Sequence, residues 1–321
     1  VRDEYGQAAG GLTCGYHGWT YDYEGNLVNL RDKRDFVDLD MSSRGLYSIK
    51  TEQYGKLIFV NFDEDAIPLS DYLGPFTKQW EEFDFGQTRL VKRYVWDLAC
   101  NWKIAMEANM EVYHVKSIHP VSVDGQIDYR GNVNVLFPRG HSRMVAPLRP
   151  EFMASAPPKP DHIPEIETVG EIARTSVQSF HLEPNIVMPV SATLFPILQF
   201  WPDGRGRTKF EIWWIGADWG EGGIPAEWQE EIRVFDDILL EDTIFGDWIQ
   251  KSVESSAFRG APLCYQEARI YHAHQSMDKT IGIDHVPLHL RIDPVLTEDW
   301  VYPKSEVERL RQYEGAKAAG E

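Results

Sequence analysis

The sequence has few cysteines, an excess of acidic over basic residues and no long uninterrupted hydrophobic run. Its three cysteines, Cys14, Cys100 and Cys264, are too few and too scattered for a secreted disulfide framework, which favours a reducing compartment such as the cytoplasm. The formal net charge of −18 argues against binding to nucleic acid or to an anionic membrane, because both need clustered basic side chains. No apolar segment reaches the roughly 20 residues that a membrane-spanning helix requires.

The residues that are abundant support a sizeable folded core. The chain has 321 residues, of which 43% are hydrophobic and 12% aromatic, so it is long enough for one large or two ordinary domains. It contains no internal repeat and no low-complexity tract.

A stretch of 20 residues from Asn101 to Pro120, NWKIAMEANMEVYHVKSIHP, carries a metal-ligand spacing. Glu111 and His114 are three residues apart and share one face of a helix, whereas His119 would point about 140° away on an ideal helix. Because Pro120 disfavours helical geometry in the residue before it, we expect the helix to end near Ser117 and His119 to turn back towards His114. Two histidines and one carboxylate form the facial triad of non-haem ferrous oxygenases. The alternative is a pair of core or surface histidines near a helix end.

The candidate for the third ligand lies on a long helix predicted from Glu227 to Glu254. Phe235, Ile238, Phe245 and Ile249 form an apolar stripe at helical spacing, and Asp242 lies in the middle of that stripe. A carboxylate is costly to bury unless it is paired or binds a metal. Asp242 is therefore predicted to be the third ligand, and the alternative is an acid paired with an arginine, either Arg233 or Arg269.

Near the start of the chain, Cys14 and His17 form a C-x2-H spacing, followed by a hairpin predicted around Gly25. Taken alone, the spacing also fits a buried cysteine beside a partly exposed histidine.

Short alternating segments predict mostly β-structure in two regions. Residues 45–63 predict strands of a small all-β domain, and residues 63–75 predict a linker, so the predicted domains are 1–72 and 73–321. In the second domain, strands are expected at 91–99, 132–138, 141–147, 192–201 and 207–217. Residues 150–164 are expected to form a surface loop, and residues 304–321 a charged amphipathic helix. In a strand, His272 and His274 would present both rings on one face and could bind metal, but they are expected to be packing or surface groups, or at most to line a pocket.

Two motifs together resemble one enzyme family. CGYHGWTYD, from Cys14 to Asp22, closely resembles the second half of the Rieske [2Fe–2S] signature, although Gly15 stands where that family often has proline. The strand-like VKRYVWDLA, the NWK entry, the acid and the two histidines follow the order of the ring-hydroxylating oxygenase α-subunits. The resemblance implies an α+β fold, with part of a Rieske domain followed by a helix-grip catalytic domain whose curved antiparallel sheet closes over a long helix.

The same resemblance implies two cofactors and a set of partners. Cys14 and His17 would bind the [2Fe–2S] cluster, and the first ligand pair would stand just before Val1, so the chain shown is expected to begin inside the motif. His114, His119 and Asp242 would bind mononuclear Fe(II). Electrons would come from a ferredoxin or a flavin reductase, and the subunits would form a homotrimer, with or without a β-subunit.

The resemblance further implies a role for Glu111 and a class of substrate. Glu111 would link His114 to a cluster histidine, His17, of the neighbouring subunit. The expected reaction is hydroxylation of an aromatic or other hydrophobic small molecule. Because Glu111 stands where aspartate is more common, oxidative C–N bond cleavage is an alternative, and a helix-grip binding module without catalysis is another. Candidate pocket residues are Glu107, Met110, Ile118, Phe245 and Trp248.

Overall fold

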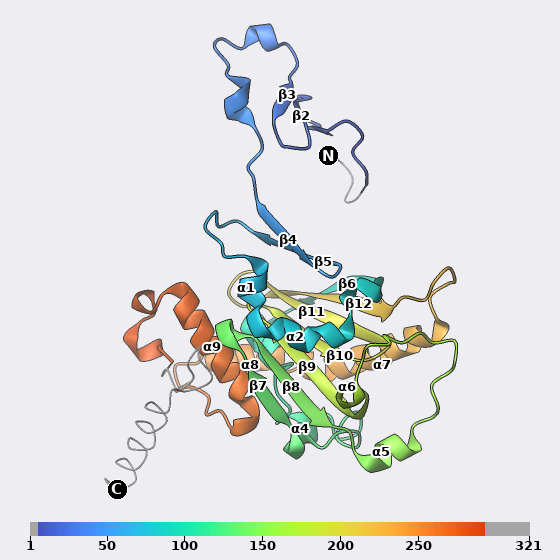
Figure 1. The fold of residues 1–321 in the computed structure, drawn as a ribbon. Helices are drawn as coiled ribbons and strands as arrows, with labels where there is room; N and C mark the ends of the chain where they lie inside the picture. Colours follow the sequence, from blue (N-terminus) through green and yellow to red (C-terminus); the bar gives the residue numbers. More distant parts are fainter. Residues whose placement is uncertain (1–5, 293–321) are drawn as a thin grey trace. The chain divides into compact units, whose positions relative to one another are not determined.

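The computed structural model describes residues 6–292, which fall into two compact units whose boundary along the chain lies between Leu69 and Ser70. Figure 1 shows the small first unit and the larger second unit, which contains the main sheet. The amphipathic helix predicted at 304–321 lies outside the described residues. Within the described part of the chain, no helix is both long enough and apolar enough to cross a membrane.

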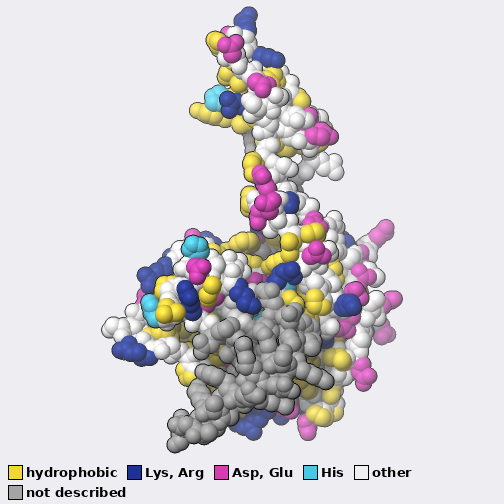
Figure 2. Space-filling view, turned by 60° about the vertical axis from the view of Figure 1, so that its left-hand side comes forward, with side chains coloured by type: hydrophobic (Ala, Val, Ile, Leu, Met, Phe, Trp, Pro, Cys, Tyr) yellow, Lys and Arg dark blue, Asp and Glu magenta, His cyan; other side chains and the backbone are white. Residues whose placement is uncertain are grey.

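The first unit contains two small antiparallel sheets. One has three short strands, β1 (Leu12–Thr13), β2 (Thr20–Tyr21) and β3 (Leu27–Asn29). The other pairs β4 (Lys50–Tyr54) with β5 (Leu57–Asn61) through the tight turn expected there. Apolar side chains lie exposed on this unit, as Figure 2 shows, and Val37 and Phe62 are among the most exposed.

The second unit is built on a seven-stranded antiparallel sheet in the order β6-β12-β11-β10-β9-β8-β7. Its strands are β6 (Thr88–Leu98), β7 (Val133–Leu136), β8 (Ser142–Pro147), β9 (Ser176–Leu182), β10 (Ile186–Val190), β11 (Leu194–Pro202) and β12 (Thr208–Ala217). The predicted α+β class is confirmed, and five of these strands were expected. Strands β9 and β10 were not predicted. In β9, polar side chains such as Gln178 and His181 interrupt the apolar pattern although both are buried, and the short β10 contains Pro189.

The helices of the second unit are mostly short. They are α1 (Leu69–Leu73), α2 (Thr77–Trp80), α3 (Trp102–Glu107), α4 (Val115–Ile118), α5 (Pro150–Ser155), α6 (Glu171–Thr175), α7 (Ala226–Thr243), α8 (Gly246–Val253) and α9 (Ala268–Ile281). Two predictions were wrong here. The segment with His272 and His274 is helical (α9), not a strand, and the loop predicted at 150–164 begins with a helix, α5.

Different elements pack on the two faces of the large sheet. On one face, Phe180 of β9 contacts the rings of Phe76 and Trp80, which lie in the segment containing α1 and α2. On the other face, Ile212 belongs to a buried apolar cluster that includes Trp228 of α7. Figure 1 shows α7 on the side of the sheet away from α2, and Ile270 and Ala273 of α9 belong to the same cluster as Trp228. The candidate site lies among the elements that pack on this second face.

The helix predicted from Glu227 to Glu254 is interrupted. It ends as α7 at Thr243 and resumes as α8 at Gly246, where the Cys100 sulfur would lie 2.8 Å from an added Cβ atom. Because glycine permits this close approach, the chain can bend there. The buried positions of α7 are Trp228, Ile232 and Leu239. Ile249, which was predicted on the buried stripe, is 43% exposed.

Candidate metal centre

The segment from Asn101 to Pro120 forms two short helices separated by a turn. Asn101 caps α3 by accepting a hydrogen bond from the Lys103 N–H, and α3 ends at Glu107. The continuous helix expected through Glu111 and His114 is therefore wrong. The Glu111 carboxylate instead accepts hydrogen bonds from the backbone N–H groups of Tyr113 and His114, which stabilises the turn before α4.

The turn and the end of α4 place the two histidines. His114 stands at the N-cap of α4, and His119 is its C-cap, with φ −115° and ψ 43°. These dihedral angles lie outside the helical region, as expected for a residue before proline. Their imidazole centroids lie 5.0 Å apart, so the rings converge although the helix between them is only four residues long.

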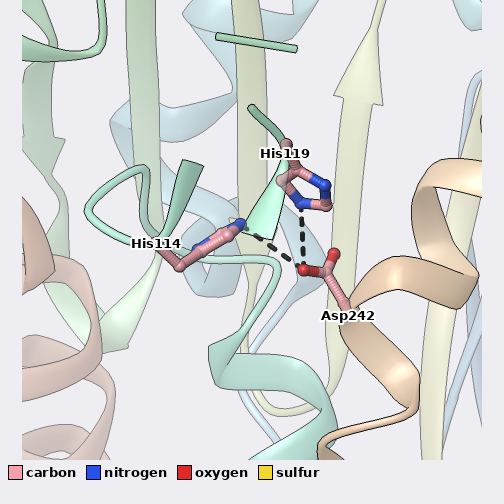
Figure 3. Close-up of side chains that lie close together, drawn as sticks. All are labelled: His114, His119 and Asp242. Atoms are coloured by element: carbon pink, nitrogen blue, oxygen red, sulfur yellow. Dashed lines mark ion pairs between the residues drawn. The ribbon is translucent and has the colours of Figure 1, made fainter. Parts of the chain in front are cut away.

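Asp242, near the end of α7, completes a three-residue cluster with the two histidines (Figure 3). Its Oδ1 atom lies 3.5 Å from His114 Nε2 and 3.0 Å from His119 Nε2, and the three ligand atoms lie within 4.8 Å of one another. Adjacent ligands of a transition metal, each about 2.1 Å from the ion, stand about 3 Å apart. The donor set and its spacing therefore fit one divalent ion held by three protein atoms, with further coordination positions open.

Each imidazole uses its other nitrogen to contact a glutamate. His114 Nδ1 pairs with Glu111 Oε1, and His119 Nδ1 lies 2.6 Å from Glu241 Oε2. A neutral imidazole that donates Nδ1–H to a carboxylate has its lone pair on Nε2. Both Nε2 atoms are thus directed at Asp242, on the side where a metal ion would bind.

The negative charges around His119 favour a cation, either a proton or a metal ion, at its ring nitrogens. Burial lowers the pKa of His119, but hydrogen bonds with Asp242 and Glu241 outweigh that effect, so its pKa is raised. Hydrogen bonds from Ser122 and His119 hold the pKa of Glu241 below its usual value. Because a metal ion competes with a proton for the same lone pair, this concentration of negative charge suits a divalent cation as well.

The residues predicted to border a pocket lie in different environments. Met110 is fully buried in the apolar cluster, and Ile118 is half-buried. The Glu107 carboxylate pairs with His274 Nε2 of α9 at 2.6 Å. Phe245 is half-buried against Trp248, whereas the Trp248 side chain is 63% exposed.

Two residues around the cluster, Glu241 and Ser122, were not predicted as site residues, and Arg269, which was considered as a partner of Asp242, contacts other groups. Glu241 contacts His119, Ser122 donates to the same Glu241 oxygen at 2.5 Å, and buried Arg269 donates from Nη1 to the Met110 carbonyl at 3.0 Å. Glu241 had a visible signal, because it immediately precedes Asp242 in the sequence. Ser122 had none, since only the fold brings it near Glu241.

In the first unit, Cys14 and His17 lie at the two ends of a closed loop. The Cys14 N–H donates to the Trp19 carbonyl at 2.8 Å, and the Gly18 N–H donates to the Cys14 carbonyl at 3.1 Å. Both Cys14 and His17 are exposed, so the alternative of a buried cysteine is wrong. Backbone N–H groups of Tyr16 and His17 lower the pKa of the Cys14 thiol, which favours the thiolate form that binds iron. The loop thus offers one thiolate and one imidazole, which suit half of a Rieske ligand set.

Known proteins resemble the chain both in sequence and in fold. The carnitine monooxygenase oxygenase subunit of Acinetobacter baumannii is 30% identical over 126 residues, which are 38% of this chain and 34% of that subunit. The benzene 1,2-dioxygenase subunit alpha of Pseudomonas putida is 25% identical over 317 residues, which are 86% of this chain and 66% of that subunit. The chain therefore matches only a third to two thirds of the length of these relatives.

Among solved structures, a quaternary ammonium Rieske monooxygenase matches the fold with a TM-score of 0.70 at 19% identity, covering 86% of this chain and 73% of that one. A naphthalene 1,2-dioxygenase from Rhodococcus sp. matches with a TM-score of 0.60 at 18% identity, covering 88% and 77%. Residues 85–283, more than half of the chain, match the family described as ring hydroxylating alpha subunit (catalytic domain). The chain belongs to this ring-hydroxylating α-subunit family.

Proposed function

We propose that this chain is the terminal oxygenase component of a Rieske-type non-haem iron system. The observation that carries the proposal is the convergence of His114, His119 and Asp242, whose ligand atoms lie within 4.8 Å of one another. Ferrous iron in such a site supplies open positions at which dioxygen and electrons can meet a substrate.

The side chains around the site have distinct tasks in this proposal. Glu111 fixes the tautomer and orientation of the His114 ring through Nδ1. The Asp242 side chain is 9% exposed and the His119 side chain 3% exposed, so both are largely screened from bulk water. Because little water surrounds these side chains, their electrostatic attraction for a metal ion is weakly screened, and bulk water has limited access to the site.

We further propose that the first unit supplies electrons through a [2Fe–2S] cluster bound in part by Cys14 and His17. The exposed loop and the lowered thiol pKa support this role. In this proposal a ferredoxin or a flavin reductase would be the electron donor, and Cys14 and His17 would hold one half of the cluster. Glu111 then links His114 to His17 of a neighbouring subunit within a homotrimer, because its carboxylate oxygens keep lone pairs free for a further hydrogen bond.

The proposed substrate is an aromatic or other hydrophobic small molecule, which the dioxygenase relatives support. A second candidate reaction is oxidative cleavage of a C–N bond. It is favoured by Glu111 in place of aspartate and by similarity to oxygenase subunits for carnitine and glycine betaine.

The proposal is tested with the full-length protein loaded anaerobically with ferrous iron and supplied with a reductase. Product formation is measured across a panel of arenes, aromatic acids and quaternary amines. Asp242→Ala is expected to lose mononuclear iron and all turnover, while the visible absorption of the cluster stays. Asp237→Ala is the matched control, since Asp237 lies on the same helix but pairs with Arg233 at the surface. Iron retention in Asp242→Ala would contradict the proposed site, and a folded protein that binds no iron would favour the binding module.

A further inference from the structure

Both ring nitrogens of His119 face consecutive acidic residues of one helix. Its Nε2 lies 3.0 Å from Asp242 Oδ1, and its Nδ1 lies 2.6 Å from Glu241 Oε2. Neighbouring residues of a helix project about 100° apart, so the two carboxylates of α7 reach the ring from different directions. The end of α7 therefore supplies both a candidate metal ligand and the partner of a second ligand.

A third group holds the Glu241 carboxylate in place. Ser122 lies three residues after His119, and its hydroxyl donates to Glu241 Oε2 at 2.5 Å. The same oxygen thus accepts two hydrogen bonds, one from Ser122 and one from His119. The Glu241 side chain is 39% exposed, so without these contacts it would be free to point into solvent. Its position is specific and does not result from burial alone.

We infer that Glu241 is a positioning residue for His119, and that Ser122 holds Glu241 in the orientation this requires. Accepting Nδ1–H fixes His119 in the tautomer whose Nε2 lone pair is available to a metal ion. His114 receives the equivalent contact from Glu111, which lies three residues before it. The partner of His119 instead comes from a helix 122 positions further along the chain. This inference rests on the proposed metal site and assigns a role to a residue outside its ligand set.

The arrangement links two ligands mechanically. Because Glu241 and Asp242 share one turn of α7, any shift of that turn moves the Asp242 ligand and the partner of His119 together. Loss of the Glu241 contact leaves Asp242 in place but frees the His119 ring to rotate or to change tautomer. The expected defect is weaker and altered metal coordination in a protein that remains folded.

The experiment measures Co²⁺ binding by the full-length protein in the absence of oxygen, by visible absorption in competition with a chelator. Glu241→Ala is expected to weaken Co²⁺ binding about 10–100-fold and to shift the ligand-field bands. Glu241→Gln should recover part of the affinity, because its amide oxygen still accepts from Nδ1–H. Ser122→Ala should weaken binding less than Glu241→Ala. Glu230→Ala, which removes a surface glutamate of the same helix, is the control and should leave binding unchanged.

His119→Ala separates failure of this inference from failure of the proposed site. If His119→Ala loses Co²⁺ while Glu241→Ala and Glu241→Gln keep the affinity and the spectrum of the parent protein, Glu241 has no positioning role. If His119→Ala itself binds Co²⁺ normally, the proposed metal site is wrong and the inference falls with it. Thermal unfolding of each variant shows whether the fold is kept, and the Gln variant serves if the Ala variant unfolds.

Discussion

The two units of the chain hold their candidate ligands in opposite ways. In the first unit, Cys14 and His17 lie in one short loop, which is closed by backbone hydrogen bonds and exposed to solvent. In the second unit, the candidate ligands come from positions as far apart as His114 and Asp242, and contacts within the fold hold them.

This difference separates a site defined by local chain geometry from one defined by packing. A loop whose donors and acceptors lie within six residues can keep its conformation with little help from a core. The second site takes its ligands from the two ends of α4 and from α7, and α9 contacts the segment before α4 through the Arg269 hydrogen bond to the Met110 carbonyl. Changes in the core should therefore disturb the second site far more than the first.

The largest expected effect is that of removing the Arg269 side chain. Arg269 is fully buried, donates to Ser142 Oγ and to the Met110 carbonyl, and has its pKa lowered by burial to about 9. Arg269→Ala leaves a cavity and two acceptors without their donor, so we expect a loss of about 3–5 kcal/mol in unfolding free energy. Chemical denaturation followed by tryptophan fluorescence measures this loss.

Two further variants show which property of Arg269 matters. Arg269→Met keeps most of the volume but removes a buried charge, so it should cost clearly less than Arg269→Ala. Arg233→Ala removes a surface arginine paired with Glu230 and Asp237 and should change stability by at most about 1 kcal/mol. Equal losses of unfolding free energy in Arg269→Ala and Arg233→Ala would show that packing around α9 does not determine the stability of the second unit.

A smaller effect, dependent on pH, is expected at Glu183. Burial raises the pKa of this carboxyl from 4.5 to about 8, and its Oε2 atom is buried without a hydrogen-bond partner. Because the folded pKa exceeds the unfolded one, the folded state is relatively stable below about pH 4.5 and loses stability as pH rises towards 8. Glu183→Gln cannot ionise, so its stability relative to the parent protein should rise by about 3 kcal/mol between pH 5 and pH 8.

Urea unfolding at several pH values measures this difference, and comparison of the two proteins cancels the titration of all other groups. Glu230→Gln, at an exposed position, should show no such trend. A parent and a Glu183→Gln protein with parallel pH profiles would mean that Glu183 is ionised in the folded state.

The sequence was sufficient to predict site residues whose positions follow from their chemistry and from the local geometry of the chain. The spacing of His114 and His119 and the proline after them predicted that the helix would end there, and the structure ends α4 at Ile118. Asp242 was selected because it fell on an apolar stripe, and the spacing of α7 does place it on the same side of the helix as the buried residues Ile232 and Leu239.

The sequence was insufficient where a side chain contacts a partner distant in the chain. Glu111 was expected within a helix, but it lies after the end of α3, and its carboxylate accepts hydrogen bonds from the backbone N–H groups of Tyr113 and His114 in the turn before α4. Strand β9 was not predicted because it contains polar residues that are buried, including His181, and the alternation of apolar and polar residues does not indicate that such side chains lie in the core. Glu241 was not predicted as a site residue, since its contact with His119 exists only in the folded protein, where α7 and α4 come together.

The smallest expected effect compares the two units through the reactivity of their cysteines. Backbone N–H groups lower the pKa of exposed Cys14, whereas burial raises the pKa of Cys100 in the second unit. The thiolate is the reactive form, so iodoacetamide should modify Cys14 at least about tenfold faster than Cys100 in protein free of cluster. Peptide mass spectrometry over time measures both rates in one sample.

Half-buried Cys264 provides an internal reference, because its pKa is also raised and it lies outside both candidate sites. Loading the [2Fe–2S] cluster should protect Cys14 and leave the rate at Cys264 unchanged, since only a ligand loses its free thiolate. Equal rates at Cys14 and Cys264 without cluster would mean that the loop does not present an activated thiolate. Protection of neither cysteine by the cluster would remove Cys14 from the ligand set. Because local hydrogen bonds hold the Cys14 loop, we expect the Cys14 thiol to stay reactive without the cluster and protected with it, even in Arg269→Ala, where the second unit is destabilised.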